Sequence, residues 1–181
     1  VRAVYVPVTG AVRLCYTATP PFDLSGSLAA LDRYPYGCLE QVTSRALPLL
    51  VAGQRDAAGG RVRESVTALD ARLDEAIGRV LDKQRYDGAF GLWSAYGEEQ
   101  PWLTAYAMDL LARARAKGRP VPDAPYLAGL DWLRRFAIDG GTEPEDLAGR
   151  AYAVHVLALA GVAAPSVARY LHDGFLDKLP T

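Results

Sequence analysis

Apolar residues three and four positions apart recur along most of the chain, and this spacing restricts its fold more than any other feature. The clearest run lies within residues 61–84 and consists of Val62, Val66, Leu69, Leu73, Ile77 and Val80. Such a run places one apolar stripe along an amphipathic helix. Glu75 and Arg79 lie one turn apart on its polar side, where they can form an ion pair. Segments of this kind, separated by Pro- and Gly-containing stretches, predict an all-α fold.

Six further helices are predicted. They cover a short segment capped by Ser25, residues 38–52, residues 101–117, a segment containing Leu127, Leu130, Leu133 and Phe136, residues 142–160, and a segment opened by Pro165. Pro101 fits the first turn of its helix, and Thr142 with Glu145 matches the capping-box pattern. The connections are short, so neighbouring helices are expected to be antiparallel.

Residues 1–24 have a different pattern, since apolar residues alternate there with other types at every second position. This pattern predicts a short β-hairpin or strand fragment. The paired prolines of "TATPPFD" then interrupt it. A boundary near Leu24 therefore divides the chain into a β fragment, 1–24, and a helical domain, 25–181. No signal-peptide pattern opens the chain.

The stretch "YPYGCLEQ", residues 34–41, places Cys38 three positions before Gln41. If Cys38 begins a helix, the two side chains share one face, and the positive end of the helix dipole favours a nucleophilic thiolate. Attack of this thiolate on the Gln41 carbonyl, with loss of ammonia, would form an internal thioester. Tyr34 and Tyr36 would exclude water from that bond, and Gly37 would hold the bend before it.

A second motif, "KQRYDGAFGLW", places Gln84, Asp87, Gly88, Phe90 and Trp93 between two predicted helices. It resembles the Q-x-x-D-G-x-[FW] loop that recurs in α/α toroids, which are rings of antiparallel helix pairs. Glycine permits a tight turn, and the aromatic side chains are expected to pack across to the next helix pair. The alternative is an aromatic-rich loop in an ordinary helical bundle.

Both motifs, together with "PPFDLSGSLAALDR" and "PWLTAYAMDLLARA", resemble the thioester domain of bacterial alpha-2-macroglobulins over most of residues 20–165. The resemblance implies a partial α/α toroid, inserted in a longer chain that traps proteases by covalent attachment to their lysine amines. Residues 1–24 would then belong to a neighbouring CUB-like β domain. The family's toroid is longer than the helical segment here, so an exposed apolar ring edge and self-association are expected.

The resemblance assigns a role to each residue of the first motif. Cys38 and Gln41 are the thioester partners, and Glu40 supports or polarises the bond. Tyr34 matches an aromatic residue that shields the bond, and Leu39 fits the bacterial variant, whereas the animal proteins carry glycine there. Neither His155 nor His172 matches the histidine that redirects some complement proteins toward hydroxyl groups. A preference for amines is therefore expected.

The family further implies a protease inhibitor and not an enzyme, with no cofactor and no metal. Its partners would be proteases and other domains of the parent chain. The parent would lie in the bacterial cell envelope, periplasmic and membrane-anchored. A nucleic-acid partner is not expected, because 20 Lys and Arg balance 21 Asp and Glu and no basic cluster stands out.

Several alternatives remain at this stage. The toroid could belong to a relative of terpene cyclases or prenyltransferases, although no DxDD motif is present and His155 and His172 are poorly placed for zinc. It could also be an adhesive thioester domain that attaches to host surfaces. Cys38 could be a buried apolar residue, a free thiol in an isolated fragment, or the partner of Cys15, which is itself expected in a strand core. Trp93, Trp102, Tyr106 and Trp132 are expected in the core, and so is the helix face that carries His155.

Overall fold

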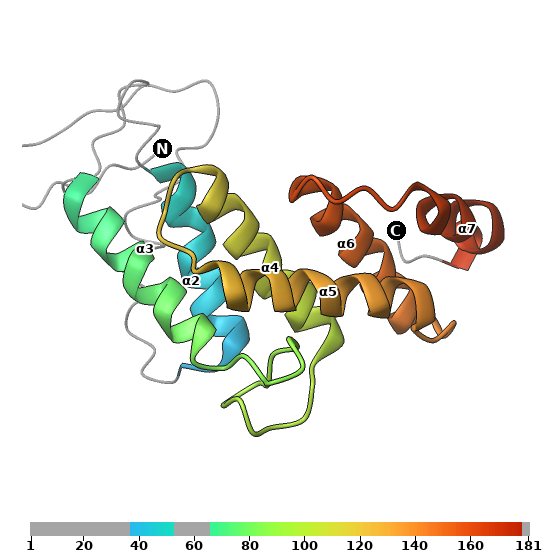
Figure 1. Ribbon diagram of the computed structural model, residues 1–181, viewed down its shortest axis with the longest axis horizontal. Coiled ribbons are helices and arrows are strands. Elements are labelled where there is room, and N and C mark those ends of the chain that lie inside the picture. Colours follow the sequence, from blue (N-terminus) through green and yellow to red (C-terminus); the bar gives the residue numbers. More distant parts are fainter. Residues whose placement is uncertain (1–36, 53–65, 179–181) are drawn as a thin grey trace, which may run out of the picture.

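The computed structural model describes residues 37–52 and 66–178, and within these ranges every named element is a helix (Figure 1). The α-helices are α2 (Leu39–Ala52), α3 (Val66–Leu81), α4 (Pro101–Ala116), α5 (Asp123–Asp139), α6 (Pro144–Leu159) and α7 (Pro165–Phe175). A short 3-10 helix, η2 (Leu176–Lys178), follows α7. The all-α prediction is confirmed for this part of the chain. The predicted β fragment at 1–24, the helix at Ser25 and the boundary near Leu24 lie outside the described residues.

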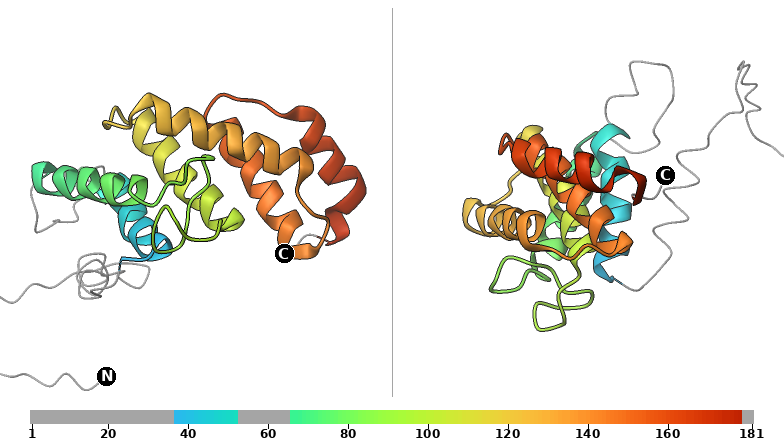
Figure 2. Two further views of the ribbon diagram at one scale, coloured as in Figure 1. Left: turned by 60° about the horizontal axis from the view of Figure 1, so that its bottom comes forward. Right: turned by 90° about the vertical axis from the view of Figure 1, so that its right-hand side faces the viewer.

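The helices are arranged as successive pairs. α2 packs against α3 and α4, α4 packs against α5 and α6, and α6 packs against α5 and α7. Figure 1 and the left view of Figure 2 both place α3 at one end of the molecule and α7 at the other. The alternate helices α2, α4 and α6 thus form a continuous row, and α3, α5 and α7 return beside it. This order is that of an arc of an α/α toroid.

The core runs along this row. α4 is the most enclosed helix of this row. Its fully buried residues face more than one side of the helix and include Met108, Leu110 and Leu111. Met108 lies against Gly129 of α5, where a methyl group on the Gly129 Cα would lie 2.3 Å from the Met108 sulfur. Glycine at this position therefore lets α4 and α5 approach closely. On α3, Leu69, Leu73, Ile77 and Val80 of the predicted apolar stripe are buried, and Glu75 and Arg79 lie 4.0 Å apart on the polar side. Val62 lies outside the described residues.

Prolines mark the starts of three helices. α4, α6 and α7 begin at Pro101, Pro144 and Pro165, where the fixed proline φ suits a first helical position and its missing N–H is not needed. The predicted capping box at Thr142 and Glu145 is wrong. α6 begins after Glu143, whose side chain makes no capping hydrogen bond, because Pro144 sets the first helical residue.

One buried cation joins α5 to α6. Arg150 of α6 is 2% exposed, and its guanidinium donates hydrogen bonds to the carbonyl oxygens of Ala137, Ile138 and Gly141 at 3.0–3.1 Å. These carbonyls belong to the last turn of α5 and the loop after it, where a helix leaves acceptors unpaired and its dipole favours a cation.

Replacing Arg150 by methionine is expected to lower the free energy of unfolding by about 2–4 kcal/mol, because several buried carbonyls lose charged donors. Urea denaturation followed by circular dichroism measures this. Arg134→Met is the control, since Arg134 is an exposed partner of Asp131 and should change stability by no more than about 0.5 kcal/mol. Equal losses in the two variants would contradict the role of Arg150.

Candidate functional site

The start of α2 is the first part of the candidate site. Cys38 immediately precedes the helix, and its carbonyl accepts the N–H of Val42 at 3.0 Å, so Cys38 is the N-cap residue. Its side chain is a free thiol and is 6% exposed. The N–H of Leu39 would lack a partner within the helix, but it donates to the carbonyl oxygen of Leu92 at 2.8 Å. The predicted position of Cys38 at a helix start is therefore confirmed.

Gln41 lies in the first turn of the same helix. Its Oε1 atom is buried, and no donor among the described residues forms a hydrogen bond with it. A buried amide oxygen without a partner costs about 1–3 kcal/mol. Such an atom is rare in folded proteins and calls for a functional explanation.

The other motif residues divide into core and surface. Leu39 is fully buried in the apolar core, and its carbonyl also accepts a hydrogen bond from the Thr43 hydroxyl at 2.8 Å. Glu40 is exposed, and its predicted role in supporting or polarising the bond stays a prediction. Gly37 is half-buried. Tyr34 and Tyr36 lie outside the described residues, and their predicted shielding role stays a prediction.

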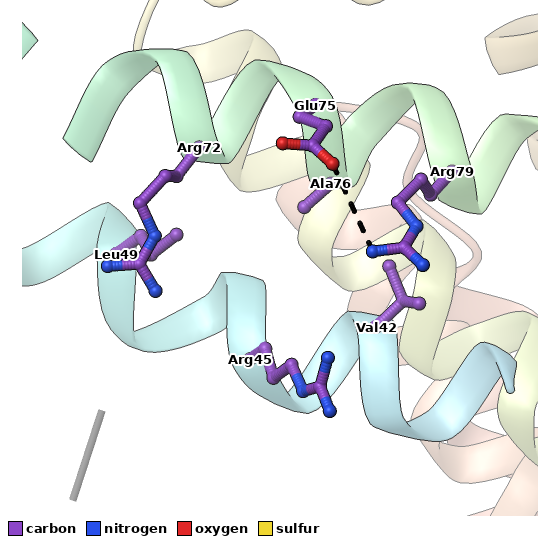
Figure 3. A pocket seen from close by; sticks show the side chains of 7 residues that line it. All are labelled: Val42, Arg45, Leu49, Arg72, Glu75, Ala76 and Arg79. Atoms are coloured by element: carbon purple, nitrogen blue, oxygen red, sulfur yellow. Dashed lines mark ion pairs between the residues drawn. The ribbon is translucent and has the colours of Figure 1, made fainter. Parts of the chain in front are cut away.

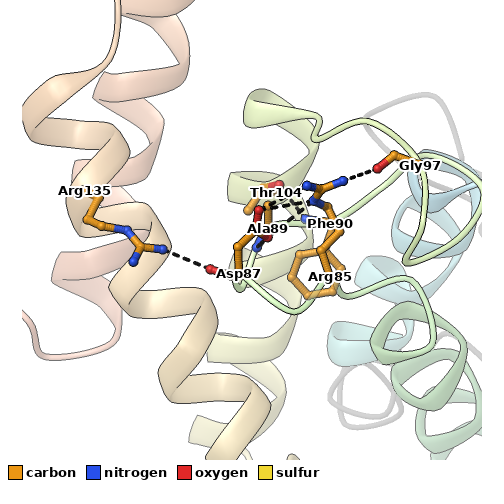
Figure 4. A network of polar contacts seen from close by, with 7 residues as sticks. All are labelled: Arg85, Asp87, Ala89, Phe90, Gly97, Thr104 and Arg135. Carbon is orange, nitrogen blue, oxygen red and sulfur yellow. Dashed lines mark hydrogen bonds and ion pairs between the residues drawn. The ribbon is translucent and has the colours of Figure 1, made fainter.

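The second motif forms a loop between α3 and α4 that ties three helices together (Figure 4). Gln84 donates through Nε2 to the carbonyls of Gly88, at 3.2 Å, and of Pro125 in α5, at 2.8 Å. The N–H of Phe90 donates to the Thr104 hydroxyl of α4 at 3.0 Å, and the Phe90 ring is fully buried. The loop is therefore a structural clamp, as the toroid motif predicts.

Charges fix the tip of this loop. Arg85 forms an ion pair with Asp87 and donates to the carbonyl of Gly97, while Arg135 of α5 donates to the Asp87 carbonyl at 2.9 Å. Partial burial raises the pKa of Asp87, but hydrogen bonds from Arg85 and from the N–H of Ala89 outweigh it, so the pKa is lowered overall. Asp87 therefore stays ionised and holds the turn.

The same loop connects the two motifs. Leu92, only two residues after the buried Phe90, supplies the carbonyl that receives the first N–H of α2. Trp93, the next residue, does not pack into the core as predicted, because its side chain is 61% exposed. Burial ends after Gly91, since Leu92 is half-buried and Trp93 is exposed.

A row of aromatic side chains lies along α4 and α6. Trp102 lies 5.3 Å from Tyr106 and 5.9 Å from Tyr152 between ring centroids, and Tyr106 shares a 3.1 Å hydrogen bond with Ser44 of α2. The core prediction holds for Trp132 but is wrong for Trp102, which is 48% exposed. Burial and the neighbouring Asp109 carboxylate raise the pKa of Tyr152, whose hydroxyl donates to Asp109.

The histidines do not contribute to a metal site. His155 is exposed and stacks on Tyr152, so the prediction of a core-facing position is wrong. His172 pairs with Asp173 at 2.8 Å on the surface. Over residues 37–52 and 66–178, no three His, Cys, Asp or Glu side chains gather closely enough to hold a metal. Over the same ranges, no helix is both long and apolar enough to cross a membrane.

A basic groove of about 240 Å³ lies between α2 and α3, close to the start of α2 (Figure 3). We call it the α2–α3 groove. Its lining residues are Val42, Arg45, Leu49, Arg72, Glu75, Ala76 and Arg79. Three arginines and one glutamate make it positively charged. The sequence pattern predicted the Glu75–Arg79 pair, but not that Arg45 of α2 would line the same groove as the charged residues of α3.

The paired helices, the clamp loop and the Cys–Gln turn define an α/α toroid of the thioester-domain class. A family model described as the A-macroglobulin TED domain matches residues 17–142. The Escherichia coli (strain K12) protein named alpha-2-macroglobulin is 39% identical over 139 residues, which are 76% of this chain and 8% of that protein. The chain therefore belongs to the alpha-2-macroglobulin family and contains its TED domain.

Solved structures agree with this assignment. Salmonella alpha-2-macroglobulin reacted with methylamine superimposes with a TM-score of 0.78 and 37% identity, over 89% of this chain and 11% of that one. Trypsin-activated alpha-2-macroglobulin from Escherichia coli gives a TM-score of 0.70 and 36% identity, over 77% of this chain and 10% of that one. The α/α toroid prediction is confirmed. The chain spans about a tenth of the length of these relatives.

The terpene cyclase alternative is matched by one relative over a shorter part of the chain. The ent-copalyl diphosphate synthase of Streptomyces sp. (strain KO-3988) is 46% identical over 54 residues, or 30% of this chain. The macroglobulin match covers 76% of the chain, and the family model spans residues 17–142. The comparisons therefore favour the macroglobulin family over a terpene cyclase.

Proposed function

We propose that this chain is the covalent-capture domain of a protease-trapping alpha-2-macroglobulin, with a thioester between Cys38 and Gln41. One observation carries the proposal. At the start of α2, a buried free thiol precedes a glutamine whose buried carbonyl oxygen has no hydrogen-bond partner among the residues that the structure describes. The chain's membership of the family supports it.

The bond would form by acyl transfer. The Cys38 sulfur attacks the Gln41 side-chain carbonyl carbon, a C–S bond forms, the C–N bond breaks, and nitrogen leaves as ammonia with the thiol proton. An amide oxygen is a strong hydrogen-bond acceptor and a thioester oxygen is a weak one. No donor among the described residues reaches this oxygen, and a dry site of that kind would penalise the amide more than the thioester and so favour ring closure. The same dryness protects the bond from water.

Capture would be a second acyl transfer, from the Cys38 sulfur to an amine. A lysine amine of a protease attacks the Gln41 carbonyl carbon, a new amide forms, and the Cys38 sulfur leaves as a thiol. Two relatives support this order, since one is described as reacted with methylamine and another as activated by trypsin. Because each thioester is consumed once, the domain acts as a single-use inhibitor and not as an enzyme.

We also propose the setting of the parent protein from its family. It would be a bacterial envelope protein, periplasmic and membrane-anchored, whose remaining domains present the bait segment and enclose the protease. Cell fractionation with an antibody against this domain tests the location. Recovery of the parent in the cytoplasmic fraction would contradict it. Self-association of the isolated domain through apolar residues on its last helices stays a prediction.

The function is tested with the full-length parent and trypsin. Covalent capture should appear on a reducing, denaturing gel as a species that contains both proteins. Pretreatment with methylamine should prevent it, because the small amine consumes the thioester first. A protein that inhibits trypsin without any covalent species would contradict the proposed capture. Equal labelling of purified host-surface components and trypsin would instead favour the adhesive alternative.

A further inference from the structure

A cation lies against the start of α2. Arg79, near the end of α3, approaches Gly37 so closely that a methyl group on the Gly37 Cα would lie 3.0 Å from Nη2 and 3.7 Å from Cζ. Figure 3 shows Arg79 extending across the α2–α3 groove toward the first turn of α2, beside Val42. Gly37 directly precedes Cys38. The absence of a side chain at Gly37 leaves room for the guanidinium.

A cation at the N-terminus of α2 is electrostatically unfavourable for that helix. The N-terminus of a helix carries a partial positive charge and favours anions. Arg79 has one weak partner in the groove, Glu75, at 4.0 Å, and the two side chains are 48% and 71% exposed. Such exposed pairs contribute little. Arg45 of α2 adds a further positive charge to the groove, and Glu75 is the one acidic residue among its described lining residues. Local rules of this kind are usually broken where function requires it.

The proposed capture step generates an anion at this end of the helix. When the amine nitrogen bonds to the Gln41 carbonyl carbon, the C–S bond breaks and its electron pair remains on the Cys38 sulfur. The amine proton passes to the sulfur or to water. Before that transfer, negative charge develops on Cys38, the residue that begins α2 and directly follows Gly37, against which the Arg79 guanidinium lies.

We propose that Arg79 is a positioning residue that accelerates opening of the thioester by stabilising the departing Cys38 thiolate. The inference rests on the proposed function. It assigns a role to a residue outside both sequence motifs. It also explains why a cation faces the positive end of α2, since together they form the electrostatic environment that a departing anion requires.

The experiment compares three variants of the full-length parent: Arg79→Met, Arg79→Lys and, as a control, Arg72→Met. Arg72 lines the same groove beside Leu49, away from the start of α2 (Figure 3). The rate of methylamine-induced thiol release is followed with a chromogenic disulfide. Arg79→Met should slow release about three- to tenfold, as expected for one partly screened charge. Arg79→Lys and Arg72→Met should remain within about twofold of the unaltered protein.

A purely structural role would not give this pattern. If charge acts, 1 M salt should reduce the difference between the unaltered protein and Arg79→Met, because screening weakens the interaction. A rate for Arg79→Met equal to that of the unaltered protein would overturn the inference, and so would an Arg79→Lys variant as slow as Arg79→Met.

Two outcomes need separate measurement. If Arg79→Met forms no thioester, the rate at which iodoacetamide alkylates its free Cys38 at neutral pH is measured in place of thiol release. This alkylation should be about three- to tenfold slower than alkylation of Cys38 in the unaltered protein after methylamine has opened its thioester. Equal alkylation rates would overturn the inference. If the unaltered protein itself releases no thiol and is not lighter by one ammonia, the proposed function fails, which is distinguishable from failure of the Arg79 role alone.

Discussion

Replacing Cys38 by alanine is expected to abolish covalent incorporation of amines at Gln41 in the full-length parent. Without the sulfur, Gln41 remains an ordinary amide, which does not react with amines at neutral pH. Because the side chain is small and buried, its loss should cost only about 1 kcal/mol of stability, so the domain should still fold. Incorporation of isotopically labelled methylamine, measured by mass spectrometry of the intact protein, gives the result.

Cys15→Ala is the matched control, because it removes the other cysteine of the chain. It should incorporate one methylamine per chain, the same amount that is expected of the unaltered protein. Labelling of Cys38→Ala to the same extent would show that amines attach elsewhere. Loss of labelling in Cys15→Ala would show that the second cysteine takes part in the chemistry.

Gly88→Ala is expected to lower the free energy of unfolding by about 3 kcal/mol or more. The φ angle of Gly88 is +95°, a backbone conformation that other residues adopt only with strain. A methyl group on its Cα would also lie 2.2 Å from the backbone carbonyl oxygen of Ala128 in α5, so the turn and the helix would have to separate. Urea denaturation of the domain measures the loss.

Gly118→Ala separates strain from collision. Gly118 also has a positive φ, +74°, but a methyl group there would meet nothing within 4 Å. Its replacement should therefore cost only about 1 kcal/mol. If the two substitutions were equally costly, the close approach of the clamp loop to α5 would not be what Gly88 provides.

The sequence predicted the parts of this fold that depend on local chemistry. The part of the α3 stripe from Leu69 to Val80, the ion pair of Glu75 with Arg79 and the tight turn at Gly88 follow from spacing and residue type, and each is confirmed. The start of α2 at Cys38 was predicted for the same reason. These features involve neighbours within one or two turns, so the sequence contains them directly.

The features that failed or were missed depend on tertiary contacts. The hydrogen bond from Leu39 to the Leu92 carbonyl joins residues 53 positions apart, and no local pattern marks either partner. Trp93 looked like a core residue because tryptophan is large and apolar, but burial ends after Gly91 and its side chain is exposed. The capping box predicted at Thr142 did not form, because Pro144 sets the first helical residue of α6. The approach of Arg79 to Gly37 likewise required the packing of α3 on α2.

Peptide mapping of freshly purified full-length parent by tandem mass spectrometry tests the central claim most directly. The peptide containing Cys38 and Gln41 is expected to be lighter by one ammonia, and its sulfur is expected to resist alkylation. After methylamine treatment, the added methyl group should lie on the Gln41 side chain, and the Cys38 thiol should become reactive. A peptide of full mass with an alkylatable Cys38 before treatment, or a Cys38 joined to Cys15, would contradict the thioester.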